Sequence, residues 1–201
     1  FTGDYGVGAL PVTGGGTRML FYPKKAAFRV GTVTTNYWDD LNIGNYSFAT
    51  GYNTRATEDY SAAFGVNSLA SGEGAFAAGN GALATGDYSF AAGHNPSVSG
   101  AHSIGLGRGA IATDSGAVAI GYHPFAFGKY SLSLGNYCYS NEDHSVTMGY
   151  HAQADHEGSF IYNDHSDNLG YVSTTAPNQF MVKAAGGSVF YSTADLSTGV
   201  E

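Results

Sequence analysis

The stretch Tyr46-Ser47-Phe48-Ala49-Thr50-Gly51 opens a pattern of 14 residues that the chain repeats eight times, as far as Glu157, without an insertion. A glycine closes the first part of each repeat, at Gly51, Gly65, Gly79, Gly93, Gly107, Gly121, Gly135 and Gly149. The residues five positions before these glycines are Tyr46, Tyr60, Gly74, Tyr88, His102, Gly116, Tyr130 and His144. Self-similarity at a short fixed period is the signature of a solenoid, so fold and function have to be inferred from the repeat.

Each repeat predicts one flattened coil made of two short strands and two tight turns. Alternation in the first strand places Phe48 and Thr50 on one face, and Ser47 and Ala49 on the other. The repeat glycine and the two residues after it form a turn, where a positive φ is expected. A second short strand and a second turn complete the coil. Stacked at about 4.8 Å, eight such coils span about 38 Å.

A coil of this size has no room for two layers of bulky side chains. Small residues fit inside it, but the large apolar residues need another surface to cover them. These large residues include Phe48, Phe64, Phe76, Phe90, Leu132 and Leu134. Self-association of identical subunits around an axis is the expected solution.

Three segments carry a resemblance to a known family. Gly116-Ala117-Val118-Ala119-Ile120-Gly121, Asn67-Ser68-Leu69-Ala70-Ser71-Gly72-Glu73 and Ala82-Leu83-Ala84-Thr85-Gly86-Asp87 resemble repeats in the heads of trimeric autotransporter adhesins, the YadA-like family. The resemblance covers 112 residues in one register. It implies an all-β fold, a left-handed parallel β-roll of 14-residue coils, in which three rolls share a hydrophobic axis as a homotrimer with irregular β caps.

Four residues depart from the repeat. Gly105 replaces the strand alanine, Phe127 replaces a small turn residue, and Pro96 and Pro124 enter the second strand. Proline donates no hydrogen bond to a sheet ladder, so these positions require that no donor is needed there. Local irregularity in coils four to seven is therefore expected.

The repeat divides the chain into three predicted parts. Residues 1–45 form an N-terminal β cap with a hairpin over 17–33, and residues 46–162 form the roll with a partial ninth repeat. Residues 163–201 form a C-terminal β segment, because Asn163 replaces the glycine and the period ends. This segment resembles those that flank such rolls in bacterial surface proteins and phage-type fibres, which implies that it leads to a stalk or chaperone. The aromatic cluster around Trp38 predicts a packed cap; a sugar-binding shelf is the alternative.

Composition limits the classes of partner. The net charge of −8 and the scattered Lys and Arg residues argue against nucleic acid, which needs a basic surface. No apolar run approaches the roughly 20 residues of a membrane helix. The single cysteine, Cys138, sits in a column of small residues, which favours a packed thiol over a reactive one.

Neither the histidines nor the acidic residues form a catalytic or metal-binding pattern that the sequence favours. His123 and His151 share a column but lie two coils apart, about 9.6 Å, which is too far for one ion unless a three-fold axis gathers copies. Asp164, Asp167 and Asn168 suggest calcium only weakly, since a polar turn explains them. We expect no cofactor, no metal and no enzymatic activity.

The resemblance implies a non-enzymatic adhesin head on a bacterial surface, a rigid trimeric spacer that binds a matrix protein or glycan through repeated weak contacts. A segment of a phage or injection-system tail fibre is the alternative. The candidate ligand-binding residues are Tyr46, Tyr60, Tyr88 and Tyr130 on one ridge, and Tyr52, His94, Arg108, Tyr122 and Tyr150 on the turn after the glycine. Stacking of these tyrosines for stability alone is an equally good interpretation.

Overall fold

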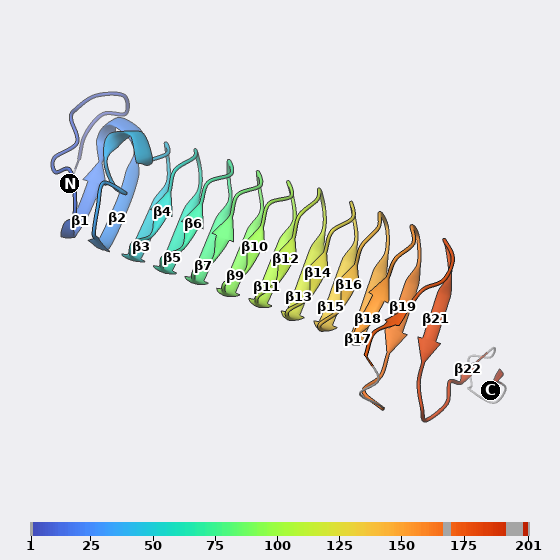
Figure 1. The fold of residues 1–201 in the computed structure, drawn as a ribbon. Helices are drawn as coiled ribbons and strands as arrows, with labels where there is room; N and C mark the ends of the chain where they lie inside the picture. Colours follow the sequence, from blue (N-terminus) through green and yellow to red (C-terminus); the bar gives the residue numbers. More distant parts are fainter. Residues whose placement is uncertain (1, 167–169, 192–198, 201) are drawn as a thin grey trace.

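The computed structural model describes residues 2–166, 170–191 and 199–200, and these form a β-solenoid of stacked coils (Figure 1). One sheet contains twelve strands and the other nine. Each coil between residues 48 and 173 contributes one strand to each sheet, and the other three strands of the longer sheet lie at its two ends. The repeat strands pair in parallel with a 14-residue offset, as in Val118 with Leu132. The predicted parallel roll of 14-residue coils is therefore confirmed, while its handedness and its trimeric state stay predictions.

The long strands of the roll make up most of the twelve-stranded sheet. They are β3 (Phe48–Tyr52), β5 (Ala62–Val66), β7 (Phe76–Asn80), β9 (Phe90–His94), β11 (Ile104–Arg108), β13 (Val118–Tyr122), β15 (Leu132–Asn136), β17 (Val146–Tyr150), β19 (Phe160–Asn163) and β21 (Phe180–Lys183).

The short strands make up the nine-stranded sheet. They are β4 (Arg55–Ala56), β6 (Leu69–Ala70), β8 (Leu83–Ala84), β10 (Ser97–Val98), β12 (Ile111–Ala112), β14 (Phe125–Ala126), β16 (Tyr139–Ser140), β18 (Ala152–Ala154) and β20 (Val172–Ser173). Strands β22 (Phe190–Tyr191) and β23 (Gly199–Val200) form a separate antiparallel pair.

Alanine fills the interior between the two sheets. Ala49 in β3 and Ala56 in β4 are fully buried, and the equivalent residues of the following coils are buried in the same way. Phe48 and Thr50 point outward and are only half-buried. The predicted separation of small and large side chains onto opposite faces is thus confirmed. It leaves an outward apolar face along the whole length of the long-strand sheet.

The repeat glycines are required by a close approach between coils. A Cβ on Gly51 would lie 1.9 Å from the carbonyl oxygen of Gly65, and one on Gly121 would lie 2.1 Å from that of Gly135. Their φ angles, +125° and +132°, are also ones that side chains disfavour. The expected positive φ in this turn continues two residues later, as in Asn53 with φ 52°.

The expected irregularity of coils four to seven is wrong, because each departure from the repeat is compensated locally. A Cβ on Gly105 would lie 2.4 Å from Cγ2 of Val98, so the larger Val98 fills the space of the missing alanine methyl. Contrary to the expectation from the sequence, Pro96 and Pro124 do not enter the short strands but lie one residue before β10 and β14. Their carbonyl oxygens accept the N–H groups of Leu83 and Ile111 at 2.9 and 3.0 Å. Phe127 points outward and still donates its N–H to Ser140 O at 2.9 Å.

The N-terminal end of the roll is closed by a hairpin of β1 (Gly16–Tyr22) and β2 (Ala27–Val33) joined by a 3-10 turn, Pro23–Lys25. The hairpin confirms the predicted one. Trp38 is fully buried and donates to Thr54 O at 2.8 Å, which favours a packed cap over a sugar shelf. A second 3-10 turn, Asp40–Asn42, follows.

Arg29 occupies the interior column at this end, directly opposite Ala49 in the strand register. Its guanidinium is fully buried and donates to the carbonyl oxygens of Phe28, Ser47 and Ala56 and to the hydroxyl of Ser47, at 2.8–2.9 Å. Burial lowers the pKa of Arg29 to about 10. The side chain fills the open end of the interior and adds a second hydrogen bond to the carbonyls of Ser47 and Ala56, which also accept the N–H groups of Phe28 and Gly44.

At the C-terminal end the stack continues past the point where the sequence period ends. Phe160 of β19 pairs with Phe180 of β21, 20 residues later instead of 14. The extra residues lie between β19 and β20, on the first turn of the coil. Asn163 ends β19 without ending the stack, and its side chain donates to Tyr150 O at 2.5 Å. The division at residues 45 and 162 stays a prediction.

Candidate ligand-binding edges of the roll

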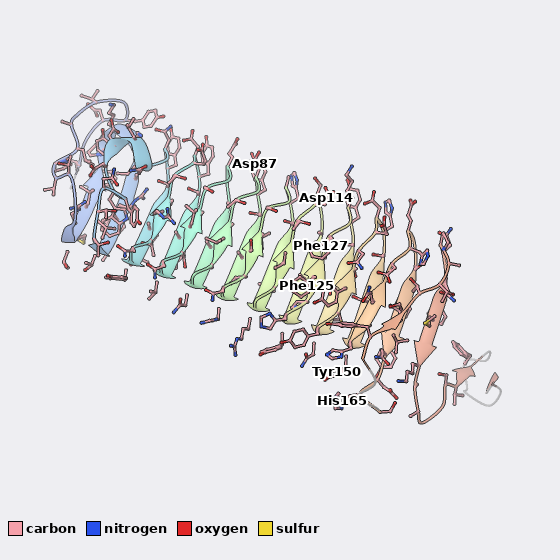
Figure 2. The ribbon with its side chains drawn as sticks, viewed as in Figure 1. Asp87, Asp114, Phe125, Phe127, Tyr150 and His165 are labelled. Carbon is pink, nitrogen blue, oxygen red and sulfur yellow. The ribbon has the colours of Figure 1, made fainter. Side chains whose placement is uncertain are left out.

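The two turns of each coil place side chains in rows along the two edges of the roll. The row that begins each repeat, here called the tyrosine edge, consists of Tyr46, Tyr60, Gly74, Tyr88, His102, Gly116, Tyr130 and His144. The row after the repeat glycines, here called the post-glycine edge, consists of Tyr52–Asn53, Val66–Asn67, Asn80–Gly81, His94–Asn95, Arg108–Gly109, Tyr122–His123, Asn136–Tyr137 and Tyr150–His151. In Figure 2, Asp87 and Asp114 lie along the upper edge, and Tyr150 and His165 along the lower one.

Both edges hold non-glycine residues in the left-handed region. Tyr60 has φ 60° and His123 has φ 50°, a conformation that side chains other than Asn and Gly adopt rarely. Hydrogen bonds between coils maintain it: Tyr60 N donates to Asn45 O and His123 N donates to Arg108 O, each at 2.8 Å. The edge side chains are therefore fixed in direction by the backbone ladder.

The aromatic rings of the tyrosine edge form three separate stacks. Ring centroids of Tyr46 and Tyr60 are 5.3 Å apart, and Tyr46 also stacks on Tyr5 at 5.1 Å. Tyr88 stacks on His102 at 5.4 Å, and Tyr130 on His144 at 5.7 Å.

Glycines at positions 74 and 116 separate these stacks. A Cβ on Gly74 would lie 2.7 Å from Cδ1 of Tyr88, and one on Gly116 would lie 2.6 Å from Cδ1 of Tyr130. Each of these rings therefore lies over the backbone of the preceding coil. The edge thus repeats as ring, ring, glycine every three coils, so the four predicted tyrosines are exposed but do not form one continuous platform.

Carboxylates on this edge are engaged with the backbone and with tyrosine hydroxyls. Asp59 accepts the N–H of Asn45 at 2.9 Å, and Asp87 accepts the N–H of Glu73 at 3.0 Å. The hydroxyl of Tyr88 donates to Glu73 at 2.7 Å, and this bond raises the pKa of Tyr88. On the same edge, the hydrogen bond with Tyr5 raises the pKa of Tyr46 to about 12. These contacts give the acidic residues a structural role.

The post-glycine edge changes character halfway along. In its first coils this edge carries single exposed side chains, including Tyr52 and His94. From Arg108 onward the rings are in contact. The guanidinium of Arg108 lies 5.3 Å from the Tyr122 ring, and His123 stacks on Tyr137 at 5.2 Å.

These contacts continue across the following coils. Tyr137 meets His151 edge-on at 5.6 Å, and Tyr150 stacks on His151 at 4.0 Å. We define the ring patch as Tyr122, His123, Tyr137, Tyr150, His151 and Tyr171. Its rings continue onto the short-strand sheet, where Tyr171 meets Tyr139 at 5.1 Å.

The insertion between β19 and β20 completes the ring patch. Tyr171 stacks on His151 at 4.8 Å, and His165 meets Tyr150 edge-on at 4.1 Å. Burial and the hydrogen bond with Tyr139 raise the pKa of Tyr171 well above its usual value. The residues that interrupt the 14-residue period therefore bring one further ring, His165, to this edge, while Tyr171 continues the column of Tyr137 and His151.

Charge is segregated between the two edges. Every acidic residue between positions 46 and 162 lies on the turn of the tyrosine edge: Glu58, Asp59, Glu73, Asp87, Asp114, Glu142, Asp143, Asp155 and Glu157. Over the same range the post-glycine edge carries no carboxylate and carries Arg108, His94, His123 and His151. Asp164, at the next position of the Tyr150 column, accepts the N–H groups of Ser166 and Ala185. Arg108 can pair with an anion, and the rings of this edge offer apolar surface.

Only part of the ring patch was predicted from the sequence. Of the predicted ligand-binding residues, Tyr122, Tyr150 and Arg108 lie in or beside it, whereas Tyr52 and His94 lie outside it. His123, Tyr137, His151 and Tyr171 were missed. The signal for the first three is present in the sequence, because the second turn residue changes from Asn or Gly to His or Tyr at position 123.

The histidines and the cysteine were the candidates for a metal site or a reactive group. His123 and His151 are separated by the Tyr137 ring, and no group of three His, Cys, Asp or Glu residues within the described ranges could hold a metal ion. Of the weak calcium candidates, Asp167 and Asn168 lie outside the described residues. Cys138 is buried, as predicted, and burial raises the pKa of its thiol.

Comparison with known proteins connects the repeat to one family model. Residues 43–68, 70–95 and 99–123 match the model described as the YadA head domain repeat (2 copies). A search among curated proteins gives no match. Within the described residues, no helix is long and apolar enough to cross a membrane.

Proposed function

Because this chain carries YadA head domain repeats over residues 43–123, we propose that it is the head segment of a homotrimeric, non-enzymatic adhesin on a bacterial surface. The matching model represents a surface adhesin family, which supports the extracellular location. In this role the solenoid is a rigid spacer that holds repeated binding edges away from the cell. Three copies of each edge multiply weak contacts into avidity.

The observation that carries the trimer is the outward face of the long-strand sheet. One outward column consists of Phe48, Ala62, Phe76, Phe90, Ile104, Val118, Leu132, Val146, Phe160 and Phe180. The second consists of Thr50, Phe64, Ala78, Ala92, Leu106, Ile120, Leu134, Met148, Tyr162 and Val182. Nearly all of these are apolar, and Phe90 remains 38% exposed in one chain.

The size of this face supports a stable interface. Ten strands at about 4.8 Å, each about 16 Å long, give an area of roughly 770 Å². A standard protein interface buries about 800 Å² on each partner. Monomeric proteins rarely leave an apolar patch of this size uncovered, so burial against identical copies is the solution we propose.

An adhesion assay with monomeric and trimeric forms tests the function. The variant Ile120→Asp places a charge on the outward face and should yield monomers, while Leu41→Asp places the same charge on an exposed position of the N-terminal cap, outside the candidate binding residues. Beads coated with the parent chain and with Leu41→Asp are expected to adhere to matrix-coated surfaces, and beads with Ile120→Asp are expected to detach. Equal adhesion by monomers would contradict the avidity mechanism.

A further inference from the structure

The ring patch is an exposed surface of connected aromatic rings. Tyr122 and Tyr171 are 37% and 44% exposed, and the rings between them are half-buried. The patch lies on the post-glycine edge and reaches the short-strand sheet through Tyr139. It is therefore separate from the long-strand face that we propose to be buried between copies.

The position of the insertion points to a binding role for this edge. Solenoid coils tolerate insertions on one face, and that face is often the one that binds a ligand. In this chain the inserted residues bring His165 against Tyr150 (Figure 2). Tyr171, which follows them, occupies the same column as His151 and stacks on it. A coil without the inserted residues would close the solenoid equally well, so stability of the stack alone does not account for them.

The side chains alternate along the edge with a regular spacing. The first column runs His94, Arg108, Tyr122, Asn136, Tyr150, with a ring at every second coil and a hydrogen-bonding side chain between the rings. Two coils correspond to about 9.6 Å, which is close to the length of two β-linked pyranose rings. Successive sugar pairs along an extended chain would therefore meet equivalent side chains.

The shape and charge of the edge select the ligand class. The rings of this edge contact one another along successive coils, as His123 contacts Tyr137, whereas protein partners concentrate their binding energy in packed pockets. The C–H face of a pyranose packs on a tyrosine ring, and the tyrosine hydroxyl remains free to bond a sugar hydroxyl. Arg108 supplies a fork of N–H donors for a carboxylate, and the carboxylate in its own column, Asp164, lies four coils away.

We propose that the ring patch and Arg108 form a binding site for an extended, β-linked saccharide that carries carboxylate groups. The sugar rings lie along the edge over Tyr122 and Tyr150, and a uronate carboxylate pairs with Arg108. This site rests on the proposed adhesin function and specifies the ligand class of that head.

Binding of a defined oligosaccharide to the full chain tests the site. The probe is a hyaluronan octasaccharide, which alternates a uronate with an N-acetylhexosamine. An N-acetylglucosamine hexamer is the neutral β-linked control, and polyglutamate is the anionic control without sugar. Calorimetry is performed on the parent chain and on Arg108→Gln, Tyr122→Ala and Tyr150→Ala.

Two matched control variants remove a tyrosine ring and an arginine that lie outside the ring patch. Tyr60→Ala removes a stacked ring from the tyrosine edge, and Arg55→Gln removes an arginine that lies 4.8 Å from the Tyr37 ring. The octasaccharide is expected to bind more tightly than both controls. Each ring-patch or Arg108 variant should weaken its binding at least tenfold, while the two matched variants should stay within twofold of the parent.

Three results would overturn the site: absence of octasaccharide binding, equal binding of the neutral hexamer or of polyglutamate, or an equal loss on Tyr60→Ala. Light scattering on the same samples separates this proposal from the proposed function. A trimer that does not bind the octasaccharide would overturn the saccharide site but not the proposed trimer. A monomer that binds it through Arg108 and Tyr122 supports the site and overturns the trimer.

Discussion

A methyl group of Val98 takes the place of a side chain on Gly105: a Cβ built on Gly105 would lie 2.4 Å from Cγ2 of Val98. Other coils place alanine at both positions, as in Ala119 and Ala112. The glycine and the valine are thus one compensated pair inside the roll. The interior volume of a coil is conserved although its residues differ.

A methyl group added at Gly105, against the side chain of Val98, should destabilise the protein. Gly105→Ala overpacks the interior, and we expect the free energy of unfolding to fall by about 1–3 kcal/mol. Val98→Ala alone leaves a cavity and should also destabilise. The double variant restores the alanine pair of the other coils. Denaturant titration of all four proteins should show the double variant more stable than Gly105→Ala; additive losses would contradict the pairing.

A side chain at a repeat glycine should disrupt the stack. Gly121→Ala would place its Cβ 2.1 Å from the carbonyl oxygen of Gly135, at a φ of +132°. We expect a loss of more than about 4 kcal/mol, since neither the backbone of the next coil nor the turn can move aside. Gly186→Ala is the control, because its Cβ meets nothing within 4 Å. Thermal unfolding followed by circular dichroism should separate the two variants; equal melting temperatures would contradict the close approach.

The buried guanidinium at the N-terminal end should contribute strongly to stability. Arg29→Ala removes four hydrogen bonds from a charged donor and opens the end of the interior. We expect a loss of about 3 kcal/mol in the free energy of unfolding. Arg55→Ala, on an outward position of β4, is the matched control and should change it by less than about 1 kcal/mol. Similar losses in both variants would indicate that Arg29 does not close the roll.

The thiol of Cys138 should be unreactive in the folded protein. Its side chain is buried and burial raises its pKa above the ordinary 9.0, so the nucleophilic thiolate is neither accessible nor formed at pH 8. Above pH 9.0 the unfolded chain releases this proton, whereas the folded chain retains it until its own, higher pKa is reached. The stability that the protonated thiol contributes is therefore fully present below pH 9.0 and is lost as pH rises through the folded pKa. A thiol reagent should label denatured but not native protein.

Replacement of Cys138 by alanine tests the predicted pH dependence of the protein's stability. Cys138→Ala should lose less stability than the parent between pH 8 and a pH above 9.0, measured by denaturant titration at each pH. Rapid labelling of the native parent, or identical pH profiles for the two proteins, would contradict burial of the thiol.

Much of the fold could be predicted because the 14-residue repeat contains the signals for the coil and for its interior. The glycine at every fourteenth residue predicts the coil, and alternation around Ala49 predicts which side chains lie inside. The outcome at Gly105 could not be predicted from its own repeat, since the compensating Val98 belongs to the short strand of the preceding repeat. Pairs of this kind become visible only when both sheets are placed together.

The ring patch was predicted in part for a related reason. Tyr122 and Tyr150 lie on a repeat column and were found by their spacing. Tyr171 lies beyond the last regular repeat, where the 14-residue period gives no position. Its contact with His151 depends on how the insertion folds back, which no local pattern in the sequence encodes.

The mass of the native protein in dilute solution tests the central claim most directly, namely that the outward face of the long-strand sheet is covered by identical copies. Multi-angle light scattering should give three times the 20.8 kDa of one chain, and Ile120→Asp should reduce that mass to one chain. A parent protein that stays folded at the mass of a single chain would contradict the account.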